Sequence, residues 1–243
     1  AVVNLAGTPV GPRPWTRGRR RAILESRLRA TRTIVAALVL LPPPDRPRVL
    51  VSASGTDAYT GRDAAPATEA SEPSHGFLAR VCLAWEAEAE RARSSGVRVV
   101  VLRVGFVLAR DAAALRLYAL PFRLGLGGPI GDGRQWMSWI HIDDVARIVC
   151  AAIDDDGLDG IVNAVGPEPA RQAEIAAAIG RALGRRSWLR VPALIVRTVM
   201  RSQSILPLGS RRIVPTRLLE RGFSFRWTDL ESAMADALGA QVP

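Results

Sequence analysis

The sequence contains no lysine, and all 33 of its basic residues are arginine, against 23 acidic residues and a formal net charge of +10. The absence of lysine excludes a phosphate-binding loop of the Walker type, which requires one. A net charge of this size is typical of proteins that bind nucleic acid. The arginines are spread along the chain, however, and the only dense run lies at the expected start of a helix: Arg17, Arg19, Arg20 and Arg21. We therefore expect no nucleic-acid partner.

Cysteine and long hydrophobic runs are also scarce. The two cysteines, Cys82 and Cys150, provide neither a disulfide framework nor the spacing of a zinc site. The longest apolar run, residues 34–41, stops at a triple proline and is too short to cross a bilayer. No basic and then apolar leader with a small-residue cleavage site is present. These absences predict a cytoplasmic protein with no membrane partner.

Apolar, β-branched runs alternate with stretches of helical period. The first run, "AVVNL" at 1–5, is typical of a fully buried strand that needs neighbours on both sides. Such alternation predicts a parallel sheet covered by helices on both faces, with ligands at the carboxyl ends of its strands. We expect strands at 1–5, 48–54, 97–105, 160–166 and 188–192, and helices at 17–41, 76–95, 112–124, 141–153, 171–183, 193–201 and 229–238.

A glycine-rich nucleotide fingerprint is missing as well. No G-x-G-x-x-G or G-x-x-G-x-x-G follows any strand of the sequence. The stretch "GLGGPIGDG" at 125–133 is rich in glycine, but a helix precedes it, so the strand–turn–helix context is absent. A lid or substrate loop is therefore favoured over a phosphate loop.

Several motifs occur together in one order: "VVNLAG", "VSAS", "FL..VC..WE", "GVRVV.LR.G.VL", "PF.LGLGGP.G.GRQWMSWIHIDD" and "VP..LL..GF.FR". With them the chain resembles the epimerase-like branch of atypical extended short-chain dehydrogenases/reductases, whose members carry a small C-terminal domain of unknown function. The resemblance covers essentially the whole chain. It implies a partial Rossmann-like NAD(P)-binding domain with the substrate loop at 1–168 and a small α+β domain at 169–243.

In that family "NLAG" closes the fourth strand. The resemblance therefore implies that roughly the first 55 to 60 residues of the family pattern, the βαβαβ half that a dinucleotide-binding domain needs, are absent. We expect an incomplete doubly wound sheet, whether the chain is a fragment, has a start assigned too late, or is degenerate; the first two are favoured. A half-sheet would leave the strand at 1–5 with an open, apolar edge.

The resemblance also implies a function. It suggests an NAD(P)-dependent epimerase or reductase with a small-molecule substrate and NADP or NAD as cofactor, and we expect this chain to be inactive or cofactor-free as it stands. A non-catalytic nucleotide-binding or regulatory module is the alternative. The family generally uses Ser, Tyr and Lys, with the tyrosine as a proton-transfer group. Here Leu78 and Cys82 stand at the Tyr and Lys positions, and Cys82 is expected to be a small buried filler.

Two catalytic candidates remain from the resemblance. Ser54 matches the family serine, although a strand-end hydroxyl can equally satisfy local backbone, and Tyr59 is the candidate replacement for the missing tyrosine. We expect Arg103 to pair with an acidic residue of a helix. The other expected site residues are Asn4, Ala6, Gly7, Ser52 and Gly105 for the cofactor, and Arg134, Trp136, Trp139 and His141 for the substrate.

Each substrate candidate has a structural alternative. Two tryptophans spaced by three, Trp136 and Trp139, can pack in a core instead of stacking on a ligand. His141, followed by Asp143 and Asp144, is more often a helix cap than a metal ligand, and we expect no metal.

Overall fold

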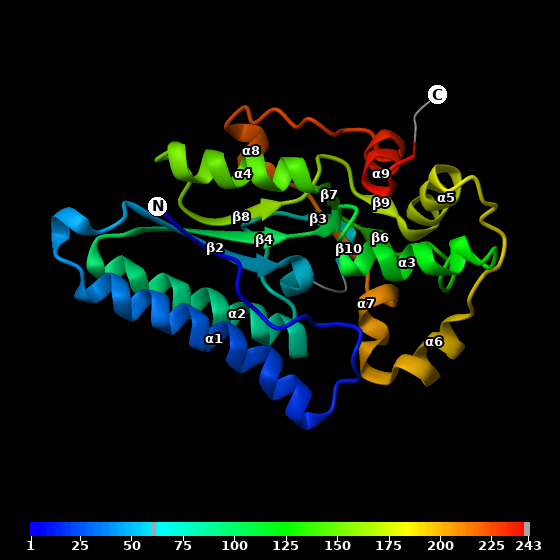
Figure 1. The fold of residues 1–243 in the computed structure, drawn as a ribbon, viewed down its shortest axis with the longest axis horizontal. Helices are drawn as coiled ribbons and strands as arrows, with labels where there is room; N and C mark the ends of the chain where they lie inside the picture. The colour runs from blue at the N-terminus through cyan, green and yellow to red at the C-terminus, as the bar shows by residue number, and fades with distance from the viewer. Residues whose placement is uncertain (60–61, 241–243) are drawn as a thin grey trace.

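A parallel sheet forms the centre of the computed structural model, which describes residues 1–59 and 62–240 (Figure 1). Each neighbouring pair of strands in it is parallel. This confirms the predicted α/β class and its parallel sheet. The strands run in the order β1 (Val2–Asn4), β2 (Val49–Gly55), β4 (Arg98–Val104) and β8 (Gly160–Ala164).

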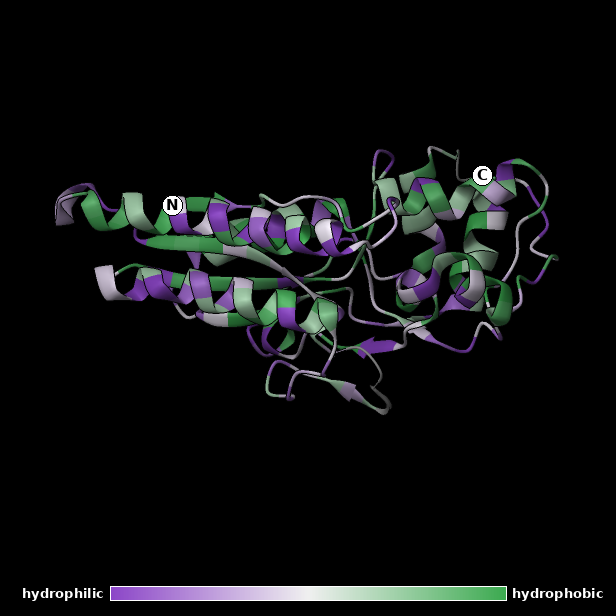
Figure 2. Cartoon of the chain, turned by 90° about the horizontal axis from the view of Figure 1, so that it is seen from below, coloured by the Kyte–Doolittle hydropathy of each residue, from purple (hydrophilic) through white to green (hydrophobic). Residues whose placement is uncertain are grey.

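Alternate residues of the central strands face two different helix layers. Val100 and Leu102 of β4 pack in one core with Ile148 of α4 (Ile142–Asp154). Val99 and Val101 pack in another core with Val35 and Leu38 of α1 (Arg17–Leu40). Both faces of these strands are therefore buried, which explains their unbroken apolar sequences. Figure 2 shows largely hydrophobic strands between helices that carry hydrophilic residues.

The first strand differs from its prediction. β1 lies at the edge of the sheet and pairs only with β2, so the expected neighbours on both sides are not found in the described part of the chain. Val3 is 39% exposed and Leu5 63% exposed, because nothing in that part covers the outer face of this edge. The expected absence of the first βαβαβ half stays a prediction.

A second group of elements lies at the carboxyl ends of the main strands. A small mixed sheet joins β3 (Arg62–Ala67), β10 (Arg211–Ile213), β6 (Trp136–Met137) and β9 (Ala170–Arg171), so strands from both sides of residue 168 share it. The proposed division at 168/169 stays a prediction. The core of this region includes residues of α3 (Ala113–Arg123), α5 (Gln172–Ala182), α9 (Leu230–Leu238) and of the parallel pair β5 (Phe106–Leu108) and β7 (Trp139–His141).

The remaining elements complete the two regions. α2 (Phe77–Glu90) packs beside α1 and against β2 (Figure 1). The predicted strand at 188–192 is wrong: only an isolated bridge between Ile130 and Val191 occurs there, because the segment pairs with a loop. The other elements are α6 (Ala193–Met200), α7 (Ile205–Leu208), α8 (Thr216–Glu220) and the 3₁₀ turns Pro43–Asp45, Thr56–Tyr59, Arg91–Ser95 and Arg201–Ser204.

Local signals in the sequence explain the ends of the two long helices. The hydroxyl of Thr16 accepts a hydrogen bond of 3.1 Å from the Arg19 N–H and thereby caps α1, as expected. Gly96 follows the 3₁₀ extension of α2 with φ of 77°, a left-handed conformation that favours glycine. The two helices thus begin and end close to where the sequence predicts.

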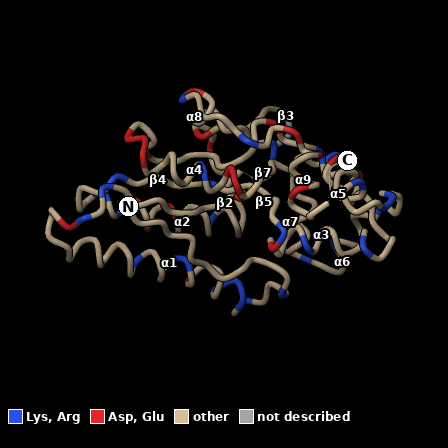
Figure 3. Tube along the Cα trace, turned by 45° about the horizontal axis from the view of Figure 1, so that its top comes forward, with Lys and Arg blue, Asp and Glu red and all other residues tan. Residues whose placement is uncertain are grey.

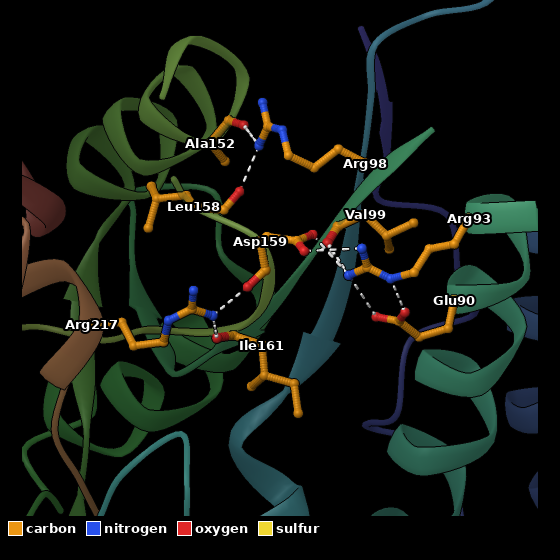
Figure 4. Close-up of polar contacts among 9 residues, drawn as sticks. All are labelled: Glu90, Arg93, Arg98, Val99, Ala152, Leu158, Asp159, Ile161 and Arg217. Carbon is orange, nitrogen blue, oxygen red and sulfur yellow. Dashed lines mark hydrogen bonds and ion pairs between the residues drawn. The ribbon is translucent and has the colours of Figure 1, made fainter. Parts of the chain in front are cut away.

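Arginine side chains connect the amino ends of β4 and β8 through hydrogen bonds and ion pairs (Figure 4). Arg98 donates hydrogen bonds to the carbonyl oxygens of Ala152 at 2.9 Å and Leu158 at 2.6 Å. Arg93, which follows α2, forms an ion pair of 2.8 Å with Asp159 and donates to the Val99 carbonyl at 3.1 Å. These guanidinium groups therefore connect helices and strands at the end of the sheet remote from the second region.

Charged residues of both signs are interspersed along the trace in Figure 3, and the basic ones do not gather in a single stripe in that view. None of the helices in the described part of the chain is long and apolar enough to cross a bilayer. The expected lack of a nucleic-acid partner stays a prediction.

Candidate active site

A cavity of about 640 Å³ lies at the carboxyl ends of the main strands. Thr56 follows β2 there, while Gly105 and Phe106 follow β4. The opposite walls come from α3 and from C-terminal residues, among them Gln203 and Arg211. The predicted substrate loop contributes residues 126, 128 and 130 to the wall. The cavity therefore occupies the place where parallel sheets bind ligands.

A buried polar network lies near the ends of β2 and β4. The Ser54 hydroxyl donates to Glu86 Oε1 at 2.6 Å, and Arg103 holds both Glu86 oxygens, at 2.8 and 2.6 Å. Burial lowers the pKa of Arg103, but the hydrogen bonds and charge of Glu86 raise it by more, so the guanidinium stays charged. The expected pairing of Arg103 with a helix acid is confirmed, since Glu86 belongs to α2.

The two predicted catalytic residues, Ser54 and Tyr59, are buried and are not among the residues that line the cavity. The Tyr59 ring is fully buried, with the Arg103 guanidinium carbon 4.6 Å from its centre. Burial raises the pKa of Tyr59, and the charge of Arg103 opposes that rise. The Ser54 hydroxyl therefore has a structural partner, but that partner is the Glu86 side chain and not the local backbone that the alternative named. The Tyr59 side chain has no exposed surface. Their catalytic roles stay predictions.

The positions where the family has Tyr and Lys hold two buried apolar side chains, Leu78 and Cys82. Burial raises the pKa of the Cys82 thiol to about 12, and the negative charges of Asp57 and Glu86 add to the effect. The thiol is therefore protonated at neutral pH and cannot act as a base or nucleophile. The expectation that Cys82 fills space is confirmed.

The predicted cofactor residues divide into exposed and buried ones. Ala6 and Gly7 are exposed at the end of β1, and Gly105 lies in the cavity wall at the end of β4. Asn4 is buried, donating to Thr31 Oγ1 at 2.9 Å and accepting from the Ala6 N–H at 3.2 Å. It therefore shapes the turn that Ala6 and Gly7 make. Ser52 is buried within β2.

Three of the predicted substrate residues, Arg134, Trp136 and Trp139, lie outside the cavity lining. Trp136 contacts the guanidinium groups of Arg171 and Arg212, whose central carbons lie 3.7 and 4.6 Å from the ring centre. Trp139 is 1% exposed and packs in the second core, as the structural alternative expected, and Arg134 is exposed. Their contact with substrate stays a prediction.

His141 caps α4. Its Nδ1 accepts a hydrogen bond of 3.2 Å from the Asp143 N–H, and its Nε2 lies 3.1 Å from Asp236 Oδ2. This pattern fits a neutral ring with the proton on Nε2. The ring also packs on Trp227, with centres 4.6 Å apart, so His141 joins α4 to the C-terminal segment. In the part of the chain that the structure describes, no group of three or more His, Cys, Asp or Glu side chains could hold a metal.

The sequence did not point to three side chains that do line the cavity: Tyr118, Met137 and Arg211. Arg211 Nη2 forms an ion pair of 2.6 Å with Asp57, and the guanidinium also donates to carbonyl oxygens of α7 residues. Tyr118 packs edge-on against Phe106, with ring centres 5.2 Å apart. The motif "GRQWMSW" at 133–139 was the sequence signal for this part of the cavity. It led to the prediction of Trp136 as a substrate residue, whereas Met137, the next residue, is the one that lines the cavity.

Two family descriptions match the chain. The "NAD dependent epimerase/dehydratase family" matches residues 1–166, which include the strands that end at the cavity. The chain belongs to this family. A "domain of unknown function (DUF1731)" matches residues 191–237. The predicted family and its C-terminal domain of unknown function are thus confirmed, and so is the nicotinamide type of cofactor that the family description names.

Curated members of the family are similar over nearly the whole chain. The human "Epimerase family protein SDR39U1" is 37% identical over 97% of this chain and 81% of its own length. The Arabidopsis thaliana "Epimerase family protein SDR39U1 homolog, chloroplastic" is 35% identical over 96% of this chain and 67% of its own length. The name of the Arabidopsis relative gives a chloroplast location, so the cytoplasmic location expected for this family member stays a prediction.

Solved structures of two family members also align. The crystal structure of the human protein with NADPH superposes with a TM-score of 0.91 at 35% identity, covering 98% of this chain and 81% of that one. A nucleoside-diphosphate sugar epimerase from Corynebacterium glutamicum superposes with a TM-score of 0.77 at 31% identity, covering 98% of this chain and 45% of that one. The Rossmann-like fold is confirmed by these superpositions. They give no support to the expectation that this chain is inactive.

Proposed function

We propose that this family member is a nicotinamide-dependent oxidoreductase or epimerase whose reaction takes place in the 640 Å³ cavity. The observation that carries the proposal is the position of the cavity, which is walled by Gly105 and Phe106 directly after β4. In open α/β sheets the crevice outside these strand ends binds the ligand. The human relative whose structure was solved with NADPH has the same fold.

The residues at this edge fit the nicotinamide end of such a cofactor. The segment 5–7 is exposed at the end of β1, and residues 9–12, which follow it, line the cavity together with Gly105. A flat ring could therefore lie between the ends of β1 and β4, with its reactive face toward the cavity. For the phosphates the fit is incomplete, because the sequence has no glycine-rich turn after a strand.

When bound, the cofactor would supply or accept a hydride. The chain itself would position the substrate and exclude water, which the apolar walls of the cavity favour. The usual tyrosine and lysine cannot assist, because Leu78 and Cys82 hold their positions. Any hydrogen bond to the reacting oxygen must therefore come from another residue of the cavity wall.

Reduced nicotinamide mononucleotide tests the proposal, because it carries the nicotinamide ring that these residues fit and only one of the phosphates of the cofactor. We expect saturable enhancement of its fluorescence by the chain. Ala114→Trp, at an exposed cavity-lining position of α3, should weaken binding at least tenfold by filling the cavity. Leu120→Trp is the matched control, on the same helix but outside the lining, and should leave binding unchanged.

Two results would contradict the oxidoreductase proposal. Absence of saturable binding by both the mononucleotide and NADPH would remove its basis, as would equal binding by the two tryptophan variants. The second candidate function is a non-catalytic nucleotide-binding module, which the burial of Leu78 and Cys82 favours. It would be supported by binding without hydride transfer to any of a panel of carbonyl compounds.

A further inference from the structure

The cavity wall is strongly apolar. Aliphatic, aromatic and proline side chains reach it from the loop after β1, from α3, from the substrate loop and from α6 and α7. Several of them are large hydrophobic residues that remain exposed in the protein, among them Leu117 at 49% and Leu126 at 51%. Exposed hydrophobic residues that share one concave surface mark a site for an apolar partner or ligand.

In the described lining of the cavity, the positively charged side chain is already paired with protein groups. Among the described residues of its lining, Arg211 is the one cation, and Asp57 and backbone carbonyl oxygens already hold its guanidinium. A diphosphate is normally bound by arginine or lysine side chains that neutralise it. Moving such an anion into these apolar walls would cost a large desolvation free energy without compensation. The cavity therefore disfavours a nucleoside-diphosphate sugar.

One polar side chain of the wall is available for a ligand. Among the described residues, none makes a hydrogen bond with the Tyr118 hydroxyl, although Tyr118 lines the cavity and packs on Phe106. Burial raises the pKa of Tyr118 to about 12, and the charge of Arg211 only partly opposes that rise. The phenol thus keeps its proton at neutral pH and is a hydrogen-bond donor.

We propose that the cavity takes an uncharged, largely apolar carbonyl compound whose oxygen accepts a hydrogen bond from Tyr118. This inference rests on the oxidoreductase function proposed above, which it narrows to one substrate class. A volume of about 640 Å³ lies in the range of cavities that enclose a small organic ligand. Tyr118 acts as a binding residue that fixes the carbonyl, while the apolar walls supply most of the affinity.

The substrate class can be tested by displacement of the neutral fluorophore N-phenyl-1-naphthylamine. We expect benzophenone to displace it and UDP-glucose to leave it bound, with and without NADPH. Leu117→Glu, which puts a carboxylate on the cavity wall, should weaken binding of the fluorophore at least tenfold. Leu120→Glu is the matched control, because Leu120 is equally exposed, at 51%, on the same helix but outside the lining.

The role of Tyr118 is tested by Tyr118→Phe with two ligands of nearly the same shape, benzophenone and diphenylmethane. Loss of one hydrogen bond should weaken benzophenone about five- to tenfold, whereas diphenylmethane, which lacks the oxygen, should bind as before. A residue that only supports the cavity wall would change both affinities equally. Equal changes, or none, would overturn the assignment of Tyr118.

The outcomes separate the two proposals. Displacement of the fluorophore by UDP-glucose but not by benzophenone would overturn the apolar substrate class and leave the oxidoreductase proposal standing. Failure of the nicotinamide mononucleotide and NADPH to bind would overturn the oxidoreductase proposal, while selective displacement by benzophenone would still identify the cavity as an apolar carbonyl site.

Discussion

The two ends of the main sheet use arginine in opposite ways. At the amino end, Arg93 and Arg98 are partly exposed and reach across the surface to carbonyl oxygens and carboxylates (Figure 4). At the carboxyl end, Arg103 is 1% exposed and is held by Glu86 inside the fold. Surface contacts thus stabilise the amino end. At the carboxyl end, Arg103 and Glu86 pair inside the fold, and the cavity wall beside them is largely apolar.

This contrast predicts that charge removal costs most at the carboxyl end. Arg103→Met should destabilise the fold by about 3–5 kcal/mol, because Glu86 is left buried without its partner. The double variant Glu86→Leu/Arg103→Met should recover most of the loss, since no charge remains buried. Urea unfolding of the single and double variants measures both. A single variant that loses less than about 1 kcal/mol would show that water reaches Glu86.

Close backbone packing at the same end gives the next largest effect. A Cβ on Gly105 would lie well inside the contact distance of the Ser138 carbonyl oxygen and 2.9 Å from Val165 Cγ1. Gly105→Ala should therefore cost about 3 kcal/mol and narrow the cavity. Gly18→Ala, in α1 with no atom near the new methyl, should instead stabilise by up to about 1 kcal/mol. Equal effects in thermal unfolding would contradict the packing argument.

At the amino end, Arg98→Ala should have an intermediate effect. Arg98 is 15% exposed in its side chain and donates to the carbonyl oxygens of Ala152, Ile153 and Leu158. Its loss leaves the end of α4 and the start of β8 without these donors, for an expected cost of about 1–3 kcal/mol. Arg48→Ala, at the exposed position before β2, is the comparison and should change unfolding little. A cost at Arg98 as large as that at Arg103 would remove the contrast between the two ends.

The smallest effect is expected at Asp159, on the surface of the amino end. The hydrogen bond from Arg93 lowers the pKa of Asp159, so its contribution is complete above the unfolded value near 4 and is lost as the pH falls through the lower, folded value. Asp159→Asn should therefore cost less than about 1 kcal/mol at pH 7, and the difference from the unaltered chain should shrink in acid and in high salt. Unfolding curves at several pH values measure this. A stability difference between Asp159→Asn and the unaltered chain that grows in acid would contradict a lowered pKa of Asp159.

The sequence predicted the main sheet well because its signals are local. Residues 99–102 are apolar at four consecutive positions, a pattern that is typical of a strand buried on both faces. The caps at Thr16 and Gly96 are equally local. The short strands β6, β9 and β10 were not predicted, since each is two or three residues long and pairs with partners distant in sequence.

The site was predicted less well for the same reason. Gly105 was selected because it ends a strand, and it does line the cavity, although its contact with a cofactor stays a prediction. Tyr118 and Arg211, in contrast, reach the cavity from segments that have no motif of their own. Trp136 was selected for its stacking surface, but the guanidinium groups of Arg171 and Arg212 already pack on its ring. Such partners become visible only once residues far apart in the sequence lie side by side.

The cavity wall runs from Pro9 near the start of the chain to Arg211 near its end. An occupant would therefore contact both regions of the molecule, and its binding would raise the free energy of unfolding of the whole chain. At a concentration one hundred times its dissociation constant, a ligand contributes about 2.7 kcal/mol in this way. A melting-temperature screen of neutral hydrophobic compounds would consequently report on the natural ligand without any assay of turnover.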